Sequence, residues 1–498
     1  MVILDKSLKW KEIEYWKSIC PDLTVTDKDV LEKELSDPNS NQKHLIDEHI
    51  TKRLHCDLKS NGYGLVNFLD VMEQNLDYGS RVKSSSSLIS LLATSIDQLT
   101  QNNLPASMIL LYDEIWYLSY LVGKLISQST HTQNQVNFDM LAWHIDPQKN
   151  ESGFSPHRDR QPDNIRDSFH KDNGQAKYVT LWLALTDATP ENSCLYMIPQ
   201  SYDPGYYNGD DEGDIDDEKH PSQDPLQRAL PDKASYQNIR AMPRSSGQAV
   251  MFTHRILHWG SKGNPSCTTP RIALSFVSSD ATFEKPYLLP PYSQIGKCNE
   301  STKKETPSVI LPPFHLRLLL VCAQLLIYYQ RLNLDGTTIR SCYDYCKKYE
   351  HLLEEKYRKK VFVEFVKAMK EVRLNNLDTG NLFSTTQKDS NTIKISCKEN
   401  DDNKNKSEIN IGDGNDDDDD DDDEEAMLEA MLDAEAAGGA DFEDDYDEEF
   451  DDDFGTDNNR QVCDDESDDD LDQPLFGIST VENHGRELGS EKKRIRFS

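Results

Sequence analysis

Five short apolar runs lie in the middle of this chain of 498 residues, separated by segments rich in Pro, Gly, Asn and Asp. Each run has the length and the β-branched and aromatic composition of a strand. They are Asn137–His144, Lys177–Leu185, Cys194–Ile198, Gln248–Thr253 and Arg271–Val277. Nothing between them reads as a crossover helix, so a parallel sheet is disfavoured. We therefore predict an antiparallel barrel or sandwich of the jelly-roll type.

Helices are expected on both sides of these strands, which makes the predicted fold class α+β. Leucines and isoleucines from Leu88 to Leu99 share one face of a helix, and the serine run before them is a suitable N-cap. Pro105 predicts the start of a second helix through Met108, Leu111, Ile115, Leu118 and Val122. A further helical segment is expected from Phe314 to Val372, after Pro312 and Pro313.

The charge is distributed unevenly. From Asp401 to the end, 38 acidic and 8 basic side chains account for −30 of the formal net charge of −35. Such a segment buries too little apolar surface to offset the entropy lost on folding. We therefore expect a helical N-terminal scaffold over 1–130, the strand-rich core over 131–290, a helical extension over 291–375 and a disordered acidic tail over 376–498. An acidic insertion over about 203–235 is expected to be a lid or disordered, and we favour disorder.

Several classes of protein are disfavoured. The ten cysteines lack the paired spacing of a zinc knuckle. The N-terminal segment has charges inside its apolar stretch, unlike a secretory signal, and the last residues, Arg-Phe-Ser, do not resemble a peroxisomal signal. The most apolar segment, Leu318–Tyr329, is too short to span a bilayer. We expect a cytoplasmic or nuclear protein that binds neither membrane nor nucleic acid, with a tail suited to a basic protein partner.

The sequence contains four His-x-Asp pairs, so this motif alone selects nothing. They are His55/Asp57, His144/Asp146, His157/Asp159 and His170/Asp172. The first lies in the helical region and the last in a polar loop. His144/Asp146 ends a predicted strand and stays a competitor. We favour His157/Asp159, because the preceding Gly-Phe-Ser-Pro turn suits a strand end that presents both side chains to a cavity.

Two imidazoles and one carboxylate on one face of an iron(II) ion leave sites open for a chelating co-substrate and oxygen. A His and an Asp two residues apart on a strand supply two of these ligands from the same face. His254 and His258 are the candidates for the third, and we favour His258, which is followed by a Trp-Gly-Ser turn. Arg271 begins the next predicted strand and could hold a carboxylate with two hydrogen bonds.

The region from Asp139 to Phe283 resembles the phytanoyl-CoA dioxygenase family of iron(II)/2-oxoglutarate oxygenases. The similar segments are 155–159 (SPHRD), 178–185 (YVTLWLAL), 189–199 (TPENSCLYMIP) and the stretch from His258 to Arg271. The resemblance implies a double-stranded β-helix with His157, Asp159 and His258 on iron, and Arg271 and Ser261 on 2-oxoglutarate. The family usually has His-Gly-Ser where this chain has His258-Trp259-Gly260-Ser261, so either Gly260 or Ser261 occupies the place of the serine.

The resemblance therefore implies a dioxygenase that needs Fe(II), 2-oxoglutarate and O2, hydroxylates a small metabolite and releases succinate and CO2. Tyr178, Trp182 and Trp259 are expected to line its pocket or to pack in the core. One alternative is a non-catalytic barrel protein that acts as a binding module through its acidic tail. Another is a cupin-like metal isomerase or lyase, which would leave Arg271 without a role.

Overall fold

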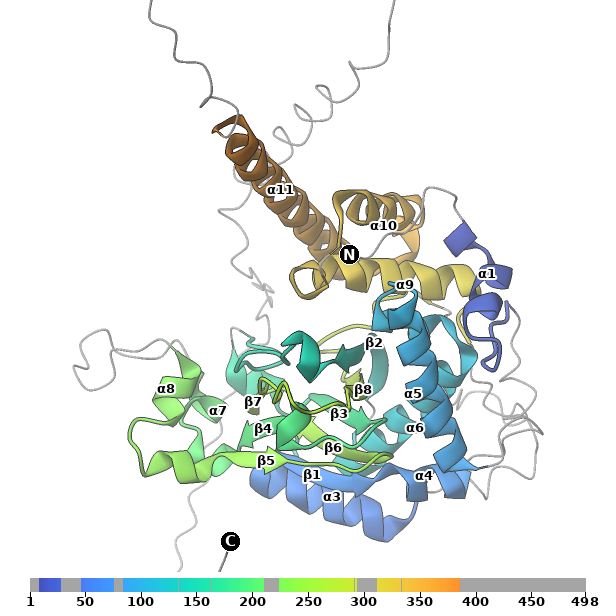
Figure 1. The fold of residues 1–498 in the computed structure, drawn as a ribbon. Helices are drawn as coiled ribbons and strands as arrows, with labels where there is room; N and C mark the ends of the chain where they lie inside the picture. The colour runs from blue at the N-terminus through green and yellow to red at the C-terminus, as the bar shows by residue number, and fades with distance from the viewer. Residues whose placement is uncertain are drawn as a thin grey trace, which may run out of the picture. The chain divides into compact units, whose positions relative to one another are not determined.

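Two antiparallel sheets form the centre of the molecule (Figure 1). The computed structural model describes residues 9–27, 46–75, 84–132, 134–162, 164–209, 224–290, 292, 311–332 and 334–385, with only the backbone at 135 and 373–385. The five-stranded sheet has the order β1 (Tyr63–Asn67), β6 (Gln248–Thr253), β3 (Tyr178–Ala184), β8 (Arg271–Ser279) and β2 (Gln135–Ile145). The three-stranded sheet has the order β5 (Arg240–Met242), β4 (Leu195–Ile198) and β7 (Leu257–Gly260).

All five strands predicted from the sequence are confirmed, as β2, β3, β4, β6 and β8. The central strand, β3, pairs with β6 on one side and β8 on the other, and all seven of its residues are buried. This position explains why its sequence is mainly apolar, with Thr180 as the exception, since a strand covered on both faces needs no polar alternation. The mixed helical and antiparallel architecture agrees with the predicted α+β class.

The N-terminal segment, predicted to be a mainly helical scaffold, also contains a strand. It contains α1 (Ile13–Ile19), α3 (Glu48–Asn61) and α4 (Phe68–Asn75), but also β1, which pairs with β6 at the edge of the larger sheet. Gly62 ends α3 at a φ of 79° and turns the chain into β1. Its carbonyl then accepts a hydrogen bond from the Thr253 amide at 3.0 Å. This strand was not predicted, because the segment around it was expected to be helical.

The two predicted helices after residue 84 are present, with a break in the second. Ser84 is the N-cap of α5 (Ser85–Gln101), and its Oγ accepts a hydrogen bond from the Ser87 amide at 3.2 Å. The prediction of one helix from Pro105 to Val122 was wrong, because a 3₁₀ helix, η3 (Ala106–Leu111), is separated from α6 (Asp113–Thr130) by the extended residue Tyr112. The amide of Asp113 donates to Thr24 O at 2.9 Å, so a tertiary contact replaces the helical bond there.

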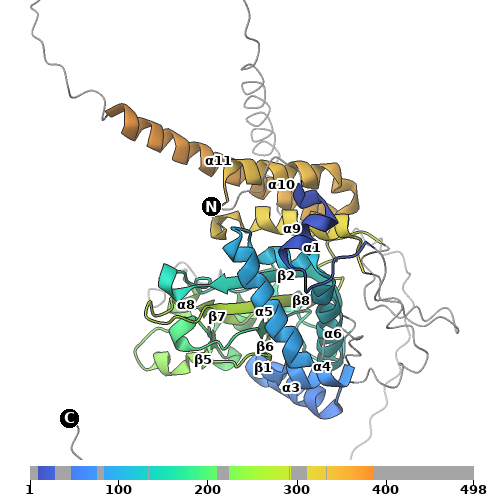
Figure 2. The same cartoon turned by 45° about the vertical axis from the view of Figure 1, so that its right-hand side comes forward.

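The helices expected from Phe314 to Val372 are present and pack on the rest of the fold. It consists of α9 (Phe314–Ile327), the short 3₁₀ helix η10 (Tyr329–Arg331), α10 (Gly336–Lys348) and α11 (Glu355–Thr385). α9 lies between α10 and the β2 side of the sheet in both views (Figures 1 and 2). Arg317 of α9 is buried and pairs with Asp113 of α6 at 2.6 Å, which fixes the extension to the N-terminal helices.

Part of the acidic insertion is helical and packs on the smaller sheet. α7 (Gly205–Asn208) lies at its start, and α8 (Pro225–Ala229) places Ala229 against Ile198 and Leu257. The prediction of disorder for the insertion falls in part on residues 210–223, which lie outside the described residues, as does most of the predicted acidic tail. Among the helices that are described, none is both long and apolar enough to cross a membrane.

Candidate metal centre and its cavity

Three of the predicted site residues, His157, Asp159 and His258, come together beside the sheets. One ligand atom from each lies within 4.8 Å of the other two. His157 and His258 are directly opposite each other in an antiparallel bridge, with an N–H···O hydrogen bond of 3.0 Å in each direction. Side chains of directly opposite residues, and of residues two apart on one strand, lie on the same face. The strand register therefore brings the three side chains together, although His258 lies about a hundred residues after the other two in the chain.

The hydrogen bonds of the two imidazoles fit metal binding. Nδ1 of His157 lies 2.7 Å from Ser155 O, and Nδ1 of His258 lies 3.0 Å from Ile256 O. A carbonyl only accepts hydrogen bonds, so each Nδ1 carries the proton and each Nε2 offers a lone pair. The Nε2 atoms lie 3.7 and 3.5 Å from Asp159 Oδ1. These separations are long for hydrogen bonds and suit atoms that surround one ion.

The protonation states fit as well. Burial, and next the neighbouring His157, lower the pKa of His258 to about 4. His258 is therefore neutral at pH 7, which is the form of imidazole that binds a metal. The donor set of two imidazoles and one carboxylate on one face matches the arrangement expected for non-haem iron(II). The residues present fit such an ion.

The carboxylate of Asp159 is oriented by β3. Thr180 donates a hydrogen bond from its Oγ1 to Asp159 Oδ2 at 2.5 Å, which leaves Oδ1 facing the two imidazoles. The Asp159 amide donates to His254 O at 3.1 Å and so fixes the backbone at this position. Outer contacts of this kind keep a ligand in the orientation that the ion requires.

The arginine between the two ligands of the loop points away from them and anchors the loop. Arg158 is buried and donates hydrogen bonds to both carboxylate oxygens of Asp203, at 2.5 and 2.9 Å. Its Nη1 also donates to Arg255 O at 2.5 Å. Alternation along the extended segment explains this arrangement, because His157 and Asp159 face one side and Arg158 the other.

The next residue, Arg160, links the loop to β2 and to the end of β8. It donates to Asp159 O at 2.7 Å, to the Asp139 carboxylate at 2.8 Å and to the Glu284 carboxylate at 2.5 and 2.9 Å. Burial alone would raise the pKa of Asp139, but Arg160 and other cationic and polar neighbours hold it below its usual value. Arg160 and its carboxylates thus form a charge-paired support beside the candidate ligands.

Arg271, the predicted anion-binding residue, is a buried cation at the start of β8. No carboxylate of the described residues lies within ion-pair distance of it, and its Nε is buried without a hydrogen-bond partner. Its guanidinium carbon lies 5.6 Å from the ring centroid of Trp182. Burial lowers the pKa of Arg271 to about 10, which still leaves it protonated at neutral pH. An unpaired buried charge is costly, so this position suits an anionic ligand.

Two glycines allow the ligand loop to approach this arginine closely. A Cβ on Gly153 would lie 2.6 Å from Gly260 Cα and 3.2 Å from Arg271 Nη2. Real Cβ atoms do not approach backbone atoms so closely, so a larger residue at Gly153 would push the loop away from the end of β7. Gly153 is the first residue of the Gly-Phe-Ser-Pro turn that favoured His157/Asp159 in the sequence. Close packing therefore requires a glycine at the start of this turn.

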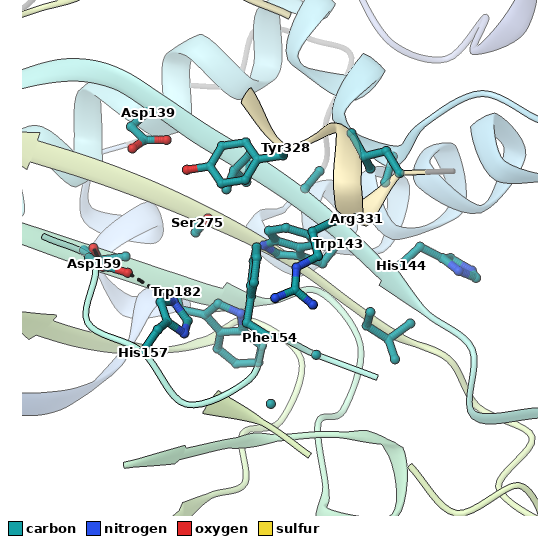
Figure 3. A pocket seen from close by; sticks show the side chains of 18 of the residues that line it. Asp139, Trp143, His144, Phe154, His157, Asp159, Trp182, Ser275, Tyr328 and Arg331 are labelled. Atoms are coloured by element: carbon teal, nitrogen blue, oxygen red, sulfur yellow. Dashed lines mark hydrogen bonds and ion pairs between the residues drawn. The ribbon is translucent and has the colours of Figure 1, made fainter. Parts of the chain in front are cut away.

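A cavity of about 820 Å³ contains these groups (Figure 3). The larger sheet contributes Thr180 and Arg271 to its lining, and the smaller sheet contributes His258. The lining also includes the segment at the end of α9 and in η10, with Tyr328 and Arg331, and further residues of β2, η3 and α11. The volume lies within the range typical of small-molecule sites.

The other predicted site residues have different positions. Tyr178, Trp182 and Trp259 all line the cavity, and Trp182 also belongs to a buried core cluster formed by residues of both sheets. Gly260 lines the cavity, whereas Ser261 does not and lies beside Tyr196. Contact of Ser261 with a co-substrate remains a prediction.

The competing His-x-Asp pairs have other partners in the structure. Figure 3 shows His144 apart from His157, beyond Trp143, and its Nε2 lies 3.3 Å from Asp97 Oδ1. Asp146 instead accepts a hydrogen bond from the Gln148 amide at 3.0 Å. His170 and His55 lie next to Asp280 and Ser129, respectively. Among the described residues, His157/Asp159 is thus the pair that meets a further histidine in a three-ligand cluster.

Sequence reasoning missed four residues that shape this site, namely Thr180, Arg160, Tyr328 and Arg331. Thr180 could have been identified from the sequence. It lies two residues from both Tyr178 and Trp182 in a predicted strand and so shares their face. Arg160 gave no signal in sequence, since its partners Asp139 and Glu284 are distant in the chain. Tyr328 and Arg331 follow an apolar helix that lies outside the predicted strand-rich core of residues 131–290.

Residues 97–273 match the family model described as Phytanoyl-CoA dioxygenase (PhyH). The resemblance predicted from the sequence is confirmed over that span. No curated protein matches the sequence.

Several solved structures are similar to parts of this chain at low sequence identity. The α-ketoglutarate dependent epimerase SnoN from nogalamycin biosynthesis has 16% identity and a TM-score of 0.33, over 53% of this chain and 94% of that chain. AviO1 from Streptomyces viridochromogenes Tue57 has 14% identity and a TM-score of 0.30, over 46% and 93%. HygX from Streptomyces hygroscopicus, with nickel and 2-oxoglutarate bound, has 12% identity and a TM-score of 0.29, over 49% and 89%.

Proposed function

We propose that this protein is an Fe(II)- and 2-oxoglutarate-dependent dioxygenase that hydroxylates a small metabolite, with release of succinate and CO2. The observation that carries the proposal is the presence of two different binding elements in one cavity. His157, Asp159 and His258 offer three metal ligands, and Arg271 offers a buried cation without a carboxylate partner. The match of residues 97–273 to a dioxygenase family supports the same conclusion.

When bound, iron(II) together with 2-oxoglutarate and O2 supplies the oxidising chemistry. The side chains of the chain hold and orient these groups. His157 and His258 offer Nε2 lone pairs, and Thr180 keeps one Asp159 oxygen turned toward them. Arg271 would bind the distal carboxylate of 2-oxoglutarate through two parallel N–H···O bonds. Ser261 is proposed as a secondary contact to the co-substrate.

The cavity walls would keep water away from the reacting groups. Trp182 and Phe252 come from the larger sheet, and Leu195 comes from the smaller sheet. Residues of both sheets line one cavity, which supports the proposal that the two sheets form a double-stranded β-helix. Excluding water strengthens every charge interaction inside the cavity.

A cytoplasmic or nuclear location is proposed from the sequence, together with the absence of membrane and nucleic-acid partners. We do not favour the alternative of a non-catalytic binding module that acts through its acidic tail. Such a module has no need for a three-ligand cluster or for an unpaired arginine buried beside it. The cupin-like isomerase or lyase is disfavoured for the same reason, since it leaves Arg271 unused.

The test is Fe(II)-dependent turnover of 2-oxoglutarate by the purified full-length chain, followed as succinate formation. We expect slow turnover without the substrate, because oxygenases of this kind oxidise the co-substrate slowly on their own. His157→Ala and His258→Ala should abolish it, and Arg271→Gln should raise the KM for 2-oxoglutarate. His170→Ala is the matched control, because this histidine belongs to another His-x-Asp pair outside the cavity. Wild-type turnover by His157→Ala and His258→Ala would refute the proposal.

A further inference from the structure

Part of the cavity lining comes from a part of the chain beyond the family match. The match ends at residue 273, whereas Tyr328 and Arg331 follow the end of α9. α9 is held against the core by hydrogen bonds from Gln324 Nε2 to Asp139 Oδ1 at 3.1 Å and to Phe138 O at 3.4 Å. The helical extension is therefore placed to contribute to recognition of what enters the cavity.

Arg331 lies at the mouth of the cavity on an aromatic surface. Its guanidinium carbon is 4.6 Å from the ring centroid of Phe154. Phe154 in turn packs edge-on against Trp143, with centroids 4.7 Å apart, and its centroid lies 5.2 Å from that of His157. Figure 3 shows the guanidinium of Arg331 beside Trp143 and over Phe154. One aromatic ring thus separates this cation from a candidate metal ligand.

The carboxylates that line the cavity are all engaged elsewhere. Asp139 pairs with Arg160, and Asp159 belongs to the metal cluster. Glu151 accepts a hydrogen bond from the Asp146 amide at 2.7 Å, and Glu364 pairs with Lys367 at 2.9 Å. Among the described residues, none places a carboxylate within ion-pair distance of Arg331. The guanidinium is thus held in place by stacking and keeps its five N–H donors for a ligand.

Tyr328 adds a second polar group to the same wall. Figure 3 shows its hydroxyl directed into the cavity on the side of Ser275 and Asp139. Burial raises the pKa of Tyr328 well above its usual value, so the hydroxyl stays protonated and can donate. The wall therefore combines a cation, a hydroxyl and the faces of two aromatic rings.

We propose that Arg331 binds the anionic group of a small organic acid or phosphate ester, whose apolar part lies along Phe154 and Trp143 and extends toward the metal centre. This inference rests on the proposed function, and it narrows the substrate from any small metabolite to a small anion. Arg331 is a specificity-determining residue in this account. Carboxylates and phosphates share the oxygen geometry that a guanidinium binds with two hydrogen bonds, so the experiment separates them.

The test compares probes that share a phenylpropyl chain and differ in the group at its end. 4-Phenylbutyrate, its neutral amide and 3-phenylpropyl phosphate are titrated calorimetrically into the full-length chain, loaded anaerobically with Fe(II) and saturating 2-oxoglutarate, which occupies Arg271. We expect the acid or the phosphate to bind about tenfold more tightly than the amide, as for a hydrogen bond to a charged group. The tighter of the two anions identifies the group that the site prefers.

Two variants assign this preference to Arg331. Arg331→Gln should remove it, and Arg331→Lys should keep part of it. Arg166→Gln is the control, because it removes an exposed arginine outside the cavity and should leave the preference intact. Arg331 is exposed, so neither variant should change the thermal unfolding temperature. Equal affinity for amide and anions, no binding of any probe, or an unchanged preference in Arg331→Gln would each overturn the proposal.

Failure of this proposal can be distinguished from failure of the proposed function. Iron and 2-oxoglutarate binding are measured on the same preparations before the probes are added. If the wild-type chain binds neither, the proposed function fails, and the anion preference is then measured on the metal-free chain. If both bind but the anion preference is absent, only the assignment of Arg331 is wrong.

Discussion

Arg160 donates a hydrogen bond from Nη2 to the Asp139 carboxylate at 2.8 Å, which ties the candidate metal loop to β2. The other carboxylate oxygen of Asp139 accepts from Gln324 of α9, so one buried acid connects the loop with the helical extension. Asp159, a candidate ligand, directly precedes Arg160 in the chain and shares this support through its carbonyl. The geometry of the metal centre therefore depends on residues well outside the family match.

Removing Arg160 should weaken both stability and metal binding. Arg160→Gln leaves Asp139 and Glu284 without their counter-charge, and loss of one partner of a largely buried ion pair costs about 3 kcal/mol. The side chain of Arg160 is 22% exposed, so we expect about 2 kcal/mol in the free energy of unfolding by urea. Arg160→Lys should recover part of this loss. Unchanged stability and metal affinity in Arg160→Gln would show that the network is dispensable.

Thr180→Val should weaken metal binding with little effect on folding. The substitution preserves the shape of the side chain but removes the hydroxyl that donates to Asp159 Oδ2. Loss of such an outer contact lowers metal affinity about tenfold. Calorimetric titration with Co(II) would measure this change, and Thr180→Ser should restore most of the affinity. Thr94→Val, on the exposed side of α5, is the control. Equal affinity in wild type and Thr180→Val would contradict the assigned role of Thr180.

His254 should make the protein less stable in mild acid. Burial, and next the adjacent Arg255, lower the pKa of His254 from 6.5 to about 3. His254 takes up a proton below pH 6.5 in the unfolded chain, but not in the folded chain. The contribution of His254 to stability is therefore full above pH 6.5 and falls as the pH drops toward 3. The expected loss at pH 5 is about 2 kcal/mol relative to pH 8.

The measurement is urea unfolding of wild type and His254→Gln from pH 8 to pH 4. The variant should lose this part of the pH dependence, while His49→Gln, at an exposed position, should keep the wild-type profile. Parallel profiles for wild type and His254→Gln would show that the pKa of His254 does not differ between the folded and unfolded chains as described.

The strands and much of the site could be predicted because their signals are local. β3 is mainly apolar, and His157 and Asp159 share a face by their spacing alone. His258 was identified by the turn that follows it, although β7 was not predicted as a strand. Its pairing with His157, which creates the site, depends on a register that neither segment specifies alone.

Long-range contacts account for what the sequence did not reveal. Tyr112 breaks a helix because the neighbouring amide bonds to Thr24, a residue far away in the chain. Arg331 follows the apolar helix α9 and resembles any surface arginine until Phe154 is found beneath it. Charge and periodicity describe a residue and its near neighbours, whereas these roles depend on the folded arrangement.

The central claim is that His157, Asp159 and His258 hold one metal ion. Anaerobic titration of the full-length chain with Fe(II) tests it most directly. The account predicts one ion per chain for the wild type and for His144→Ala, and no binding at the same concentrations for His157→Ala or His258→Ala. Loss of binding in His144→Ala, with retention in His157→Ala and His258→Ala, would contradict it.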